Sequence, residues 1–321
     1  MYILAAKIEI GDFVFRSVNE VEITKSVAEL VDTAIIKMPT KFRVKSNNDQ
    51  KFIEECIKPG DKVKITLAYE GKYEGVEFSG FVKKVNPKIP MEIHCEDAMW
   101  LLRRKNIAKS WKKTTLKEVL QEVVSGTGIK LSNKIPSVNL ESWIIKNKNG
   151  TQVLQEIKET MGMSAFLDDD GSLYCGLQQS TNIGQIVKYD LNYNLVENNL
   201  EFKTADEKKI KAVCHWIDKK TNKKQTFTAG DEDGEIKEFK SPSYDKKLMQ
   251  EIAEKTIKEA KVAGFEGDVT SFLLPFANRG MTAKIIDKEH ANREGNYFIK
   301  TVVTTYGMSG ARRKVTLSNR L

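Results

Sequence analysis

The feature that most constrains the fold is a residue pattern that begins near position 60 and returns 220 residues later. Two glycines, a lysine–isoleucine pair, a phenylalanine and a valine keep the same spacing in both copies. The matched positions are Gly60, Lys64, Ile65, Gly75, Phe78 and Val82 in the first copy, and Gly280, Lys284, Ile285, Gly295, Phe298 and Val302 in the second. With two extra residues in the last loop, Ile93 and Cys95 then align with Val315 and Leu317. This spacing predicts one structural unit used twice, in the order strand, loop, strand, turn, strand.

The residues around the first copy favour a small barrel. Residues 62–69 alternate apolar and polar side chains, and Gly11-Asp12 between apolar residues indicates a hairpin turn. Residues 48–57 are predicted to form a short helix that stops before Pro59-Gly60. Many short antiparallel strands with one short helix predict a β-barrel domain over residues 1–98. We interpret Gly75 and Gly295 as turn glycines, where a positive φ would make a β-branched side chain costly.

The pattern changes over residues 99–190, where two helices are predicted. Thr115 has Glu118 three residues later, which is the spacing of a capping box at a helix start. A second helix is predicted over residues 151–161. The run from Asp168 to Gly171 lies between alternating apolar residues and indicates a hairpin. A calcium loop is disfavoured because the spaced ligands and the distal glutamate of an EF-hand are lacking. This part is predicted to be a small α+β domain.

Strands return over residues 191–321, which are predicted to form the second barrel with a long helix near residues 245–263. The predicted fold class is therefore mainly β with α+β elements, as two related small β-barrels that flank a small α+β middle domain. A length of 321 residues accommodates about two or three domains.

Several functional classes are disfavoured by composition. No apolar run approaches the ~20 residues that span a bilayer, and the first residues lack the order of a signal peptide. The four cysteines are scattered without a CxxC, so we expect reduced, mostly buried thiols. Histidine and cysteine are neighbours in His94-Cys95 and in Cys214-His215, and neighbours in a strand point to opposite faces. One such pair cannot easily supply two ligands to one metal ion, so we expect no metal and no cofactor.

The formal net charge is +8, and the densest basic run has no acidic residue from 103 to 113. It consists of Arg103, Arg104, Lys105, Lys109, Lys112 and Lys113. One hypothesis is a nucleic-acid-binding surface. A solvated connector is favoured, because no nucleic-acid-binding motif accompanies the charge, so a specific nucleic-acid ligand is not expected.

The sequence shows no arrangement typical of catalysis. It contains no G-x-S-x-G, P-loop, H-E-x-x-H or G-x-G-x-x-G motif, and only three histidines. We expect no enzymatic activity and no catalytic residues, although a hydrolase built from scattered carboxylates stays an alternative.

Several motifs together resemble a known family. The residues that carry the resemblance are 57–63, 78–82, 95–97, 100–102, 115–128, 153–173, 264–267, 280, 295–297 and 307–317. In order and spacing they resemble the baseplate hub proteins of contractile-tailed phages, including the late-control D family and the hub of PBSX-like prophages. One departure is Met281, where the family often has an aspartate like Asp61.

The resemblance implies a structural hub that forms a homotrimer at the centre of a baseplate. Each subunit would contribute two barrels, so that three subunits form a ring of six that meets a hexameric tail tube and a trimeric spike. The implied partners are the chain itself, the tube, spike and other baseplate proteins. The protein would be made in the bacterial cytoplasm and incorporated in a virion, bacteriocin or injection particle. The alternatives are a tail-associated peptidoglycan-cleaving enzyme and a nucleic-acid-binding protein.

Overall fold

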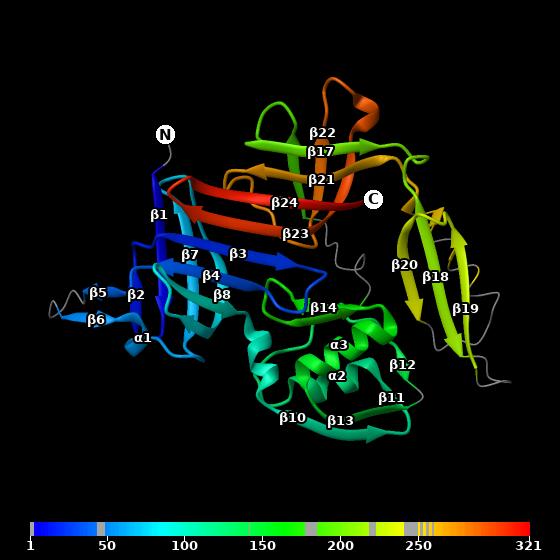
Figure 1. Cartoon of the computed structure of the whole chain (residues 1–321), viewed down its shortest axis with the longest axis horizontal. Helices are drawn as coiled ribbons and strands as arrows, with labels where there is room; N and C mark the ends of the chain where they lie inside the picture. The colour runs from blue at the N-terminus through cyan, green and yellow to red at the C-terminus, as the bar shows by residue number, and fades with distance from the viewer. Residues whose placement is uncertain are drawn as a thin grey trace.

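The structure of the chain is a computed structural model that describes most of its residues (Figure 1). The described residues are 3–43, 49–140, 142–176, 185–217, 223–240, 250, 253–254, 257–258 and 260–321. They form a mainly β protein, which confirms the predicted fold class. Within these ranges no helix is long and apolar enough to cross a membrane.

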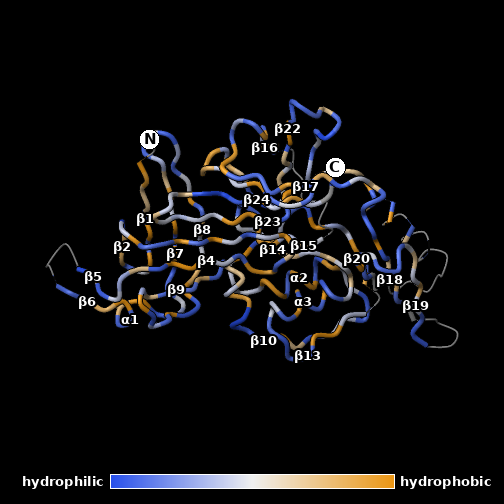
Figure 2. Tube along the Cα trace, turned by 45° about the horizontal axis from the view of Figure 1, so that its top comes forward, coloured by the Kyte–Doolittle hydropathy of each residue, from blue (hydrophilic) through white to orange (hydrophobic). Residues whose placement is uncertain are grey.

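The first barrel contains seven strands of one sheet. They are β1 (Leu4–Ile10), β2 (Phe13–Phe15), β3 (Glu20–Ser26), β4 (Thr33–Met38), β7 (Lys62–Tyr69), β8 (Tyr73–Asn86) and β9 (Met91–Glu96). Figure 1 shows β1 and β7 running across the direction of β3 and β4, so the sheet curves round into a barrel. Alternate residues along these strands point inward to a shared core, in which Ile8 and Ile65 are fully buried. Figure 2 shows hydrophobic residues along β1 and hydrophilic ones on the outlying β5 (Lys41–Arg43) and β6 (Gln50–Phe52).

The predicted helix over residues 48–57 is shorter than expected. Only α1 (Ile53–Cys56) is helical, because residues 50–52 instead form β6, which pairs with β5. Pairing with β5 gives hydrogen-bond partners to backbone N–H and C=O groups that a helix would have paired internally. An additional turn of helix would by itself be only marginally stable. The predicted hairpin turn is confirmed, since Gly11 has a φ of 54° between β1 and β2.

The middle part begins with a short 3-10 helix, η1 (Ala98–Arg103). It continues through β10 (Asn106–Trp111), β11 (Thr114–Thr115), α2 (Leu116–Val124), β12 (Asn139–Leu140), β13 (Trp143–Asn149), α3 (Gly150–Met161), β14 (Ser164–Leu167) and β15 (Leu173–Gly176). The capping box of Thr115 and Glu118 is present, and Asn149 forms a second one with Gln152 at the start of α3. The helices also share a sequence, since residues 119–122 and 153–156 both read Val-Leu-Gln-Glu. The predicted hairpin at residues 168–171 is confirmed as the β14–β15 turn.

The second barrel has its own core and six strands. They are β16 (Ile186–Asp190), β17 (Glu197–Lys203), β21 (Gly264–Ser271), β22 (Thr282–Ile286), β23 (Gly295–Gly307) and β24 (Gly310–Arg320). The part of the chain that connects β17 to β21 in sequence forms a separate three-stranded sheet of β18 (Ile210–Ile217), β19 (Lys224–Gly230) and β20 (Glu235–Lys240). The long helix predicted near residues 245–263 lies largely outside the described residues; those described at 250, 253–254, 257–258 and 260 are helical.

Candidate assembly interface

The two barrels are joined edge to edge into one 13-stranded sheet. β23 of the second barrel pairs antiparallel with β3 of the first, from Thr301 opposite Ser26 to Gly307 opposite Glu20. The sequence favours this junction locally, because residues 301–305 are all threonine or valine, which fit a pleated and half-buried surface. Figure 1 shows β24, β23, β3 and β4 side by side across the centre of the molecule. We call this β3–β23 pairing the internal seam.

The strand order on the two sides of the internal seam is the same. One side reads β17-β21-β24-β23 and the other reads β3-β4-β9-β8. The registers also match: Gly60 N–H donates to Val82 O at 2.8 Å, and Gly280 N–H donates to Ile299 O at 2.9 Å. Val82 lies opposite Cys95, and Ile299 lies opposite Leu317. In both copies the register shifts immediately after this pair. The chain therefore presents the same four-strand path twice.

The strands of the two copies align at different sequence offsets. On β7 and β22 the offset is the 220 residues seen in the sequence, so Lys64 and Ile65 correspond to Lys284 and Ile285. On β8 and β23 the hydrogen-bond register gives 217, and Ile299 occupies the place that the sequence spacing assigned to Val302. In the same register Phe298 lies opposite Thr282, as Phe81 rather than Phe78 lies opposite Lys62.

The repeat glycines have two different structural roles. Gly60 and Gly280 both have positive φ, 98° and 81°, which a side chain would strain. The expectation of positive φ at Gly75 and Gly295 is wrong, because neither has it. Both lie in or at the start of a strand, where a Cβ would collide with the Tyr73 hydroxyl or with the Arg320 guanidinium. These two glycines therefore provide space for a neighbouring side chain rather than a turn conformation.

Two edges of the four-strand paths are open within the described chain. β17 pairs with β21 and with no other described strand. Residues 84–86 of β8 pair with β9, while the pairing of β8 with β7 ends at Phe81 opposite Lys62. By position, β17 corresponds to β3, and residues 84–86 correspond to the start of the part of β23 that pairs with β3. Unpaired strand edges are templates for another strand.

The barrels and the middle part meet at a charged junction. Arg279 Nη2 lies 2.9 Å from Asp32 Oδ2, both side chains are buried, and Arg279 also donates to Leu167 O. Asp97 accepts hydrogen bonds from the backbone N–H groups of Asp32 and Met99. Burial, with the nearby charge of Asp32, raises the pKa of Asp97 to about 7. Burial likewise raises the pKa of Asp32. This junction fixes three segments that lie far apart in sequence.

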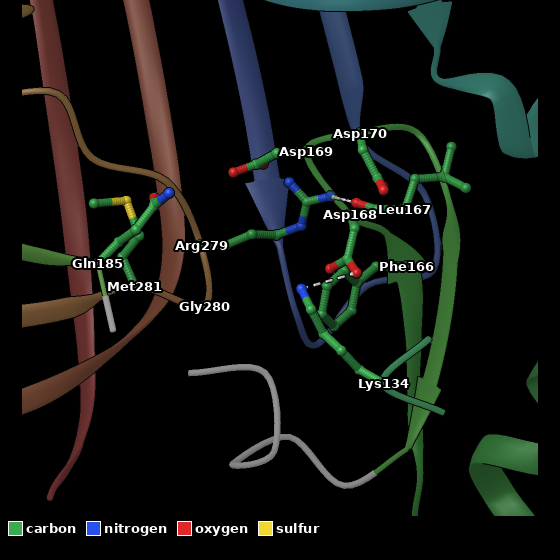
Figure 3. A pocket seen from close by; sticks show the side chains of 10 residues that line it. All are labelled: Lys134, Phe166, Leu167, Asp168, Asp169, Asp170, Gln185, Arg279, Gly280 and Met281. Atoms are coloured by element: carbon green, nitrogen blue, oxygen red, sulfur yellow. Dashed lines mark hydrogen bonds and ion pairs between the residues drawn. The ribbon is translucent and has the colours of Figure 1, made fainter. Parts of the chain in front are cut away.

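A cavity of about 250 Å³ lies beside this junction (Figure 3). The aspartates that line it are engaged by the protein itself: Asp168 accepts from Ser132 and Lys134, Asp169 from Asn278, and Asp170 from Ser172. Figure 3 shows Arg279 reaching across to the loop that bears them. The cavity is thus lined by groups that hold the hairpin against the second barrel.

Several other residues singled out in the sequence are buried or make local contacts. Cys95, Cys175 and Cys214 are buried and reduced, and burial raises the pKa of Cys175 to about 12. Across the described ranges, no group of three or more His, Cys, Asp or Glu side chains is arranged to hold a metal ion. In the basic run, Arg103 pairs with Glu96, and Lys109 pairs with Glu122.

No protein-family model and no curated protein matches this sequence. Solved structures do match its fold over almost the whole chain. The 43 kDa tail protein of prophage MuSo2 from Shewanella oneidensis has a TM-score of 0.66 at 14% identity, covering 98% of both chains. A tail protein from Neisseria meningitidis MC58 has a TM-score of 0.66 at 13% identity, covering 100% of this chain and 97% of that one.

A third similar structure comes from a secretion system. It is the E. coli c3393 protein, a component of the type VI secretion system described as similar in structure to the T4 bacteriophage tail proteins gp27 and gp5. The TM-score is 0.59 at 11% identity, and the match covers 98% of this chain and 76% of that one. The fold of this chain is thus the one seen in these two phage-type tail proteins and in this component of a type VI secretion system, as the resemblance of its motifs led us to expect.

Proposed function

We propose that the chain is the structural baseplate hub of a contractile phage tail or tail-like injection particle. In this role a homotrimer adapts a hexameric tail tube to a trimeric spike and contacts other baseplate proteins. The single observation that carries the proposal is the doubled four-strand path across the internal seam. Three chains would offer six such paths, twenty-four strands in all, which can face a sixfold ring while the trimer itself stays threefold.

The internal seam also supplies a template for the contact between subunits. In the seam, Thr301, Val302 and Val303 lie opposite Ser26, Lys25 and Thr24. The corresponding residues at the two open edges are Lys84, Val85 and Asn86 on β8, and Lys203, Phe202 and Glu201 on β17. We therefore pair residues 84–86 of one subunit with residues 201–203 of the next. Pro87 follows immediately and has no N–H to donate, so this seam is shorter than the internal one.

The trimer closes the edges that a single chain leaves open. Repeating the seam three times around an axis gives every β17 and every β8 a partner, as barrel closure does within one chain. The proposed parts of each subunit are the first barrel, the α+β middle part, and a second barrel that includes β16, since β16 pairs with β22. The proposed location is the assembled particle. The proposal gives the chain no catalytic role, and purified chain should not clear a suspension of bacterial cell walls.

A cysteine pair across the proposed seam tests the arrangement. Residues directly opposite on antiparallel strands lie ~4.5–5.5 Å apart at Cα, within reach of a disulfide. Asn86→Cys combined with Glu201→Cys should link chains into covalent trimers in purified particles under oxidising conditions. The matched control combines Asn86→Cys with Asn199→Cys, two residues out of register, and should link far less. Absence of links between chains in the first pair would contradict the proposed seam.

A further inference from the structure

Strand direction places two hairpin turns on the same rim of the sheet. From β24 through β23, β3, β4 and β9 to β8, each neighbouring pair is antiparallel, so β23 and β8 run the same way. The turn after β23 and the turn after β8 therefore lie on one rim, which we call the hairpin rim. The chain leaves β9 for the middle part, and β17 for the β18–β20 sheet, at the opposite rim.

The two turns at the hairpin rim join equivalent pairs of strands, the β23–β24 hairpin being four residue pairs longer, and each turn exposes a large apolar side chain. Ile89, between β8 and β9, is 94% exposed, and Met308, between β23 and β24, is 104% exposed. Hairpin turns usually carry glycine, asparagine, aspartate or serine, each for a conformational reason. An isoleucine or methionine side chain that stays exposed to water forgoes the favourable free energy of burying its apolar surface. A polar side chain at the same position would not carry this cost. Their recurrence at equivalent turns indicates a common contact.

The position and number of these side chains identify the partner. One apolar tip on each half of the chain becomes six tips on one rim of a trimer. A threefold spike needs one contact per subunit and cannot use both kinds of tip equivalently, whereas a ring of six identical subunits can. The large additions to the fold, the middle part and the β18–β20 sheet, leave from the other rim; β5 and β6 follow β4 at the hairpin rim in the first barrel only.

We propose that the hairpin rim docks onto a ring of six identical tail-tube subunits, each with one apolar socket, and that Ile89 and Met308 fill these sockets alternately. This inference rests on the proposed function and adds to it the face that meets the tube and the residues that anchor it. Neither residue carried any signal in the sequence, because an isolated apolar residue in a turn is identified only once the two turns are seen to be equivalent and exposed.

The test uses the full-length chain, first shown by light scattering to be a trimer, and the tube protein of the same particle purified as hexameric rings. The variants are Ile89→Ser, Met308→Ser and both together. The matched controls are Ile144→Ser on β13 and Ile236→Ser on β20, which are exposed apolar residues away from the hairpin rim. All four positions are exposed, so the variants should fold and form trimers as the wild type does.

Each hairpin substitution should weaken binding to immobilised tube rings by about tenfold or more, the scale of losing one buried Ile or Met side chain, and the double variant should weaken it further. The control variants should bind as the wild type does. Unchanged binding by the double variant, equal losses in the controls, or a wild-type trimer that does not bind the rings would each overturn the inference. A chain that forms no trimer under any condition would instead contradict the proposed function.

Discussion

Arg313 on β24 and Glu77 on β8 form a buried ion pair that ties the second barrel to the first. Arg313 Nη2 lies 2.8 Å from Glu77 Oε1, Nη1 lies 3.1 Å from Oε2, and each side chain is only 2% exposed. Arg313 also donates to the carbonyls of Leu273 and Ala277, in the loop between β21 and β22. The pair thus fixes how the two barrels lie relative to each other, which a ring of equivalent paths requires.

Removing one charge of this pair should be costly. Glu77→Gln leaves a buried guanidinium without its counter-charge, so we expect a loss of about 3–5 kcal/mol in the free energy of unfolding. Tyr73→Phe is the matched control, because it removes a hydroxyl that donates to Glu77 but leaves both charges in place; its expected cost is about 1 kcal/mol. Urea titration measures both, and equal losses would argue against a dominant role for the charge.

Stability should depend on pH through Asp97. Its pKa is raised from 3.8 to about 7 by burial and by the charge of Asp32, so the folded state binds a proton that the unfolded state has released. The free energy of unfolding should therefore fall as pH rises from about 4 to 7, by about 1.4 kcal/mol for each pH unit in that interval. Asp97→Asn should flatten this dependence in denaturant titrations at pH 5 and pH 8. The same pH slope in the variant and the wild type would refute this assignment.

The glycines that begin the two copies should be equally sensitive to substitution. Gly60→Ala and Gly280→Ala each place a side chain at positive φ, at a cost of about 1 kcal/mol or more. Thermal unfolding of the two variants should show similar losses, since the residues hold equivalent positions. A large loss at one glycine and none at the other would show that the two copies do not share this constraint.

The N-caps of α2 and α3 in the middle part should contribute equally to the stability of the folded chain. Thr115→Ala and Asn149→Ala each remove the side chain that accepts the N3 backbone N–H, at about 1 kcal/mol each. Thr160→Ala is the control, because Thr160 lies near the end of α3 and bonds only to the carbonyl of Glu156. Circular dichroism during urea unfolding should therefore show no comparable loss for the control.

The sequence predicts the elements well where local chemistry decides them. The capping box at Thr115, the hairpin at residues 168–171 and the turn at Gly11 all depend on residues within one turn of each other. The alignment of β23 with β8 could not be predicted from local sequence. Gly295 and Phe298 match Gly75 and Phe78 in spacing, but hydrogen bonds of Gly280 to Ile299, not side-chain identity, set the alignment.

Other features of the interface depend on contacts between distant residues. The internal seam joins residues 20–26 to 301–307, and no local pattern indicates which strand edge receives which partner. The ion pair of Glu77 and Arg313 joins residues 236 positions apart. Each residue alone reads as an ordinary charged residue in a strand, and only the fold shows that both are buried.

Electron microscopy of particles purified through a tag on this chain tests the central claim most directly. The hub account predicts three copies on the tube axis, with six four-strand paths forming one continuous wall and residues 84–86 of each subunit beside residues 201–203 of the next. Six copies of the chain in the ring, or a position at the periphery away from the tube axis, would contradict it.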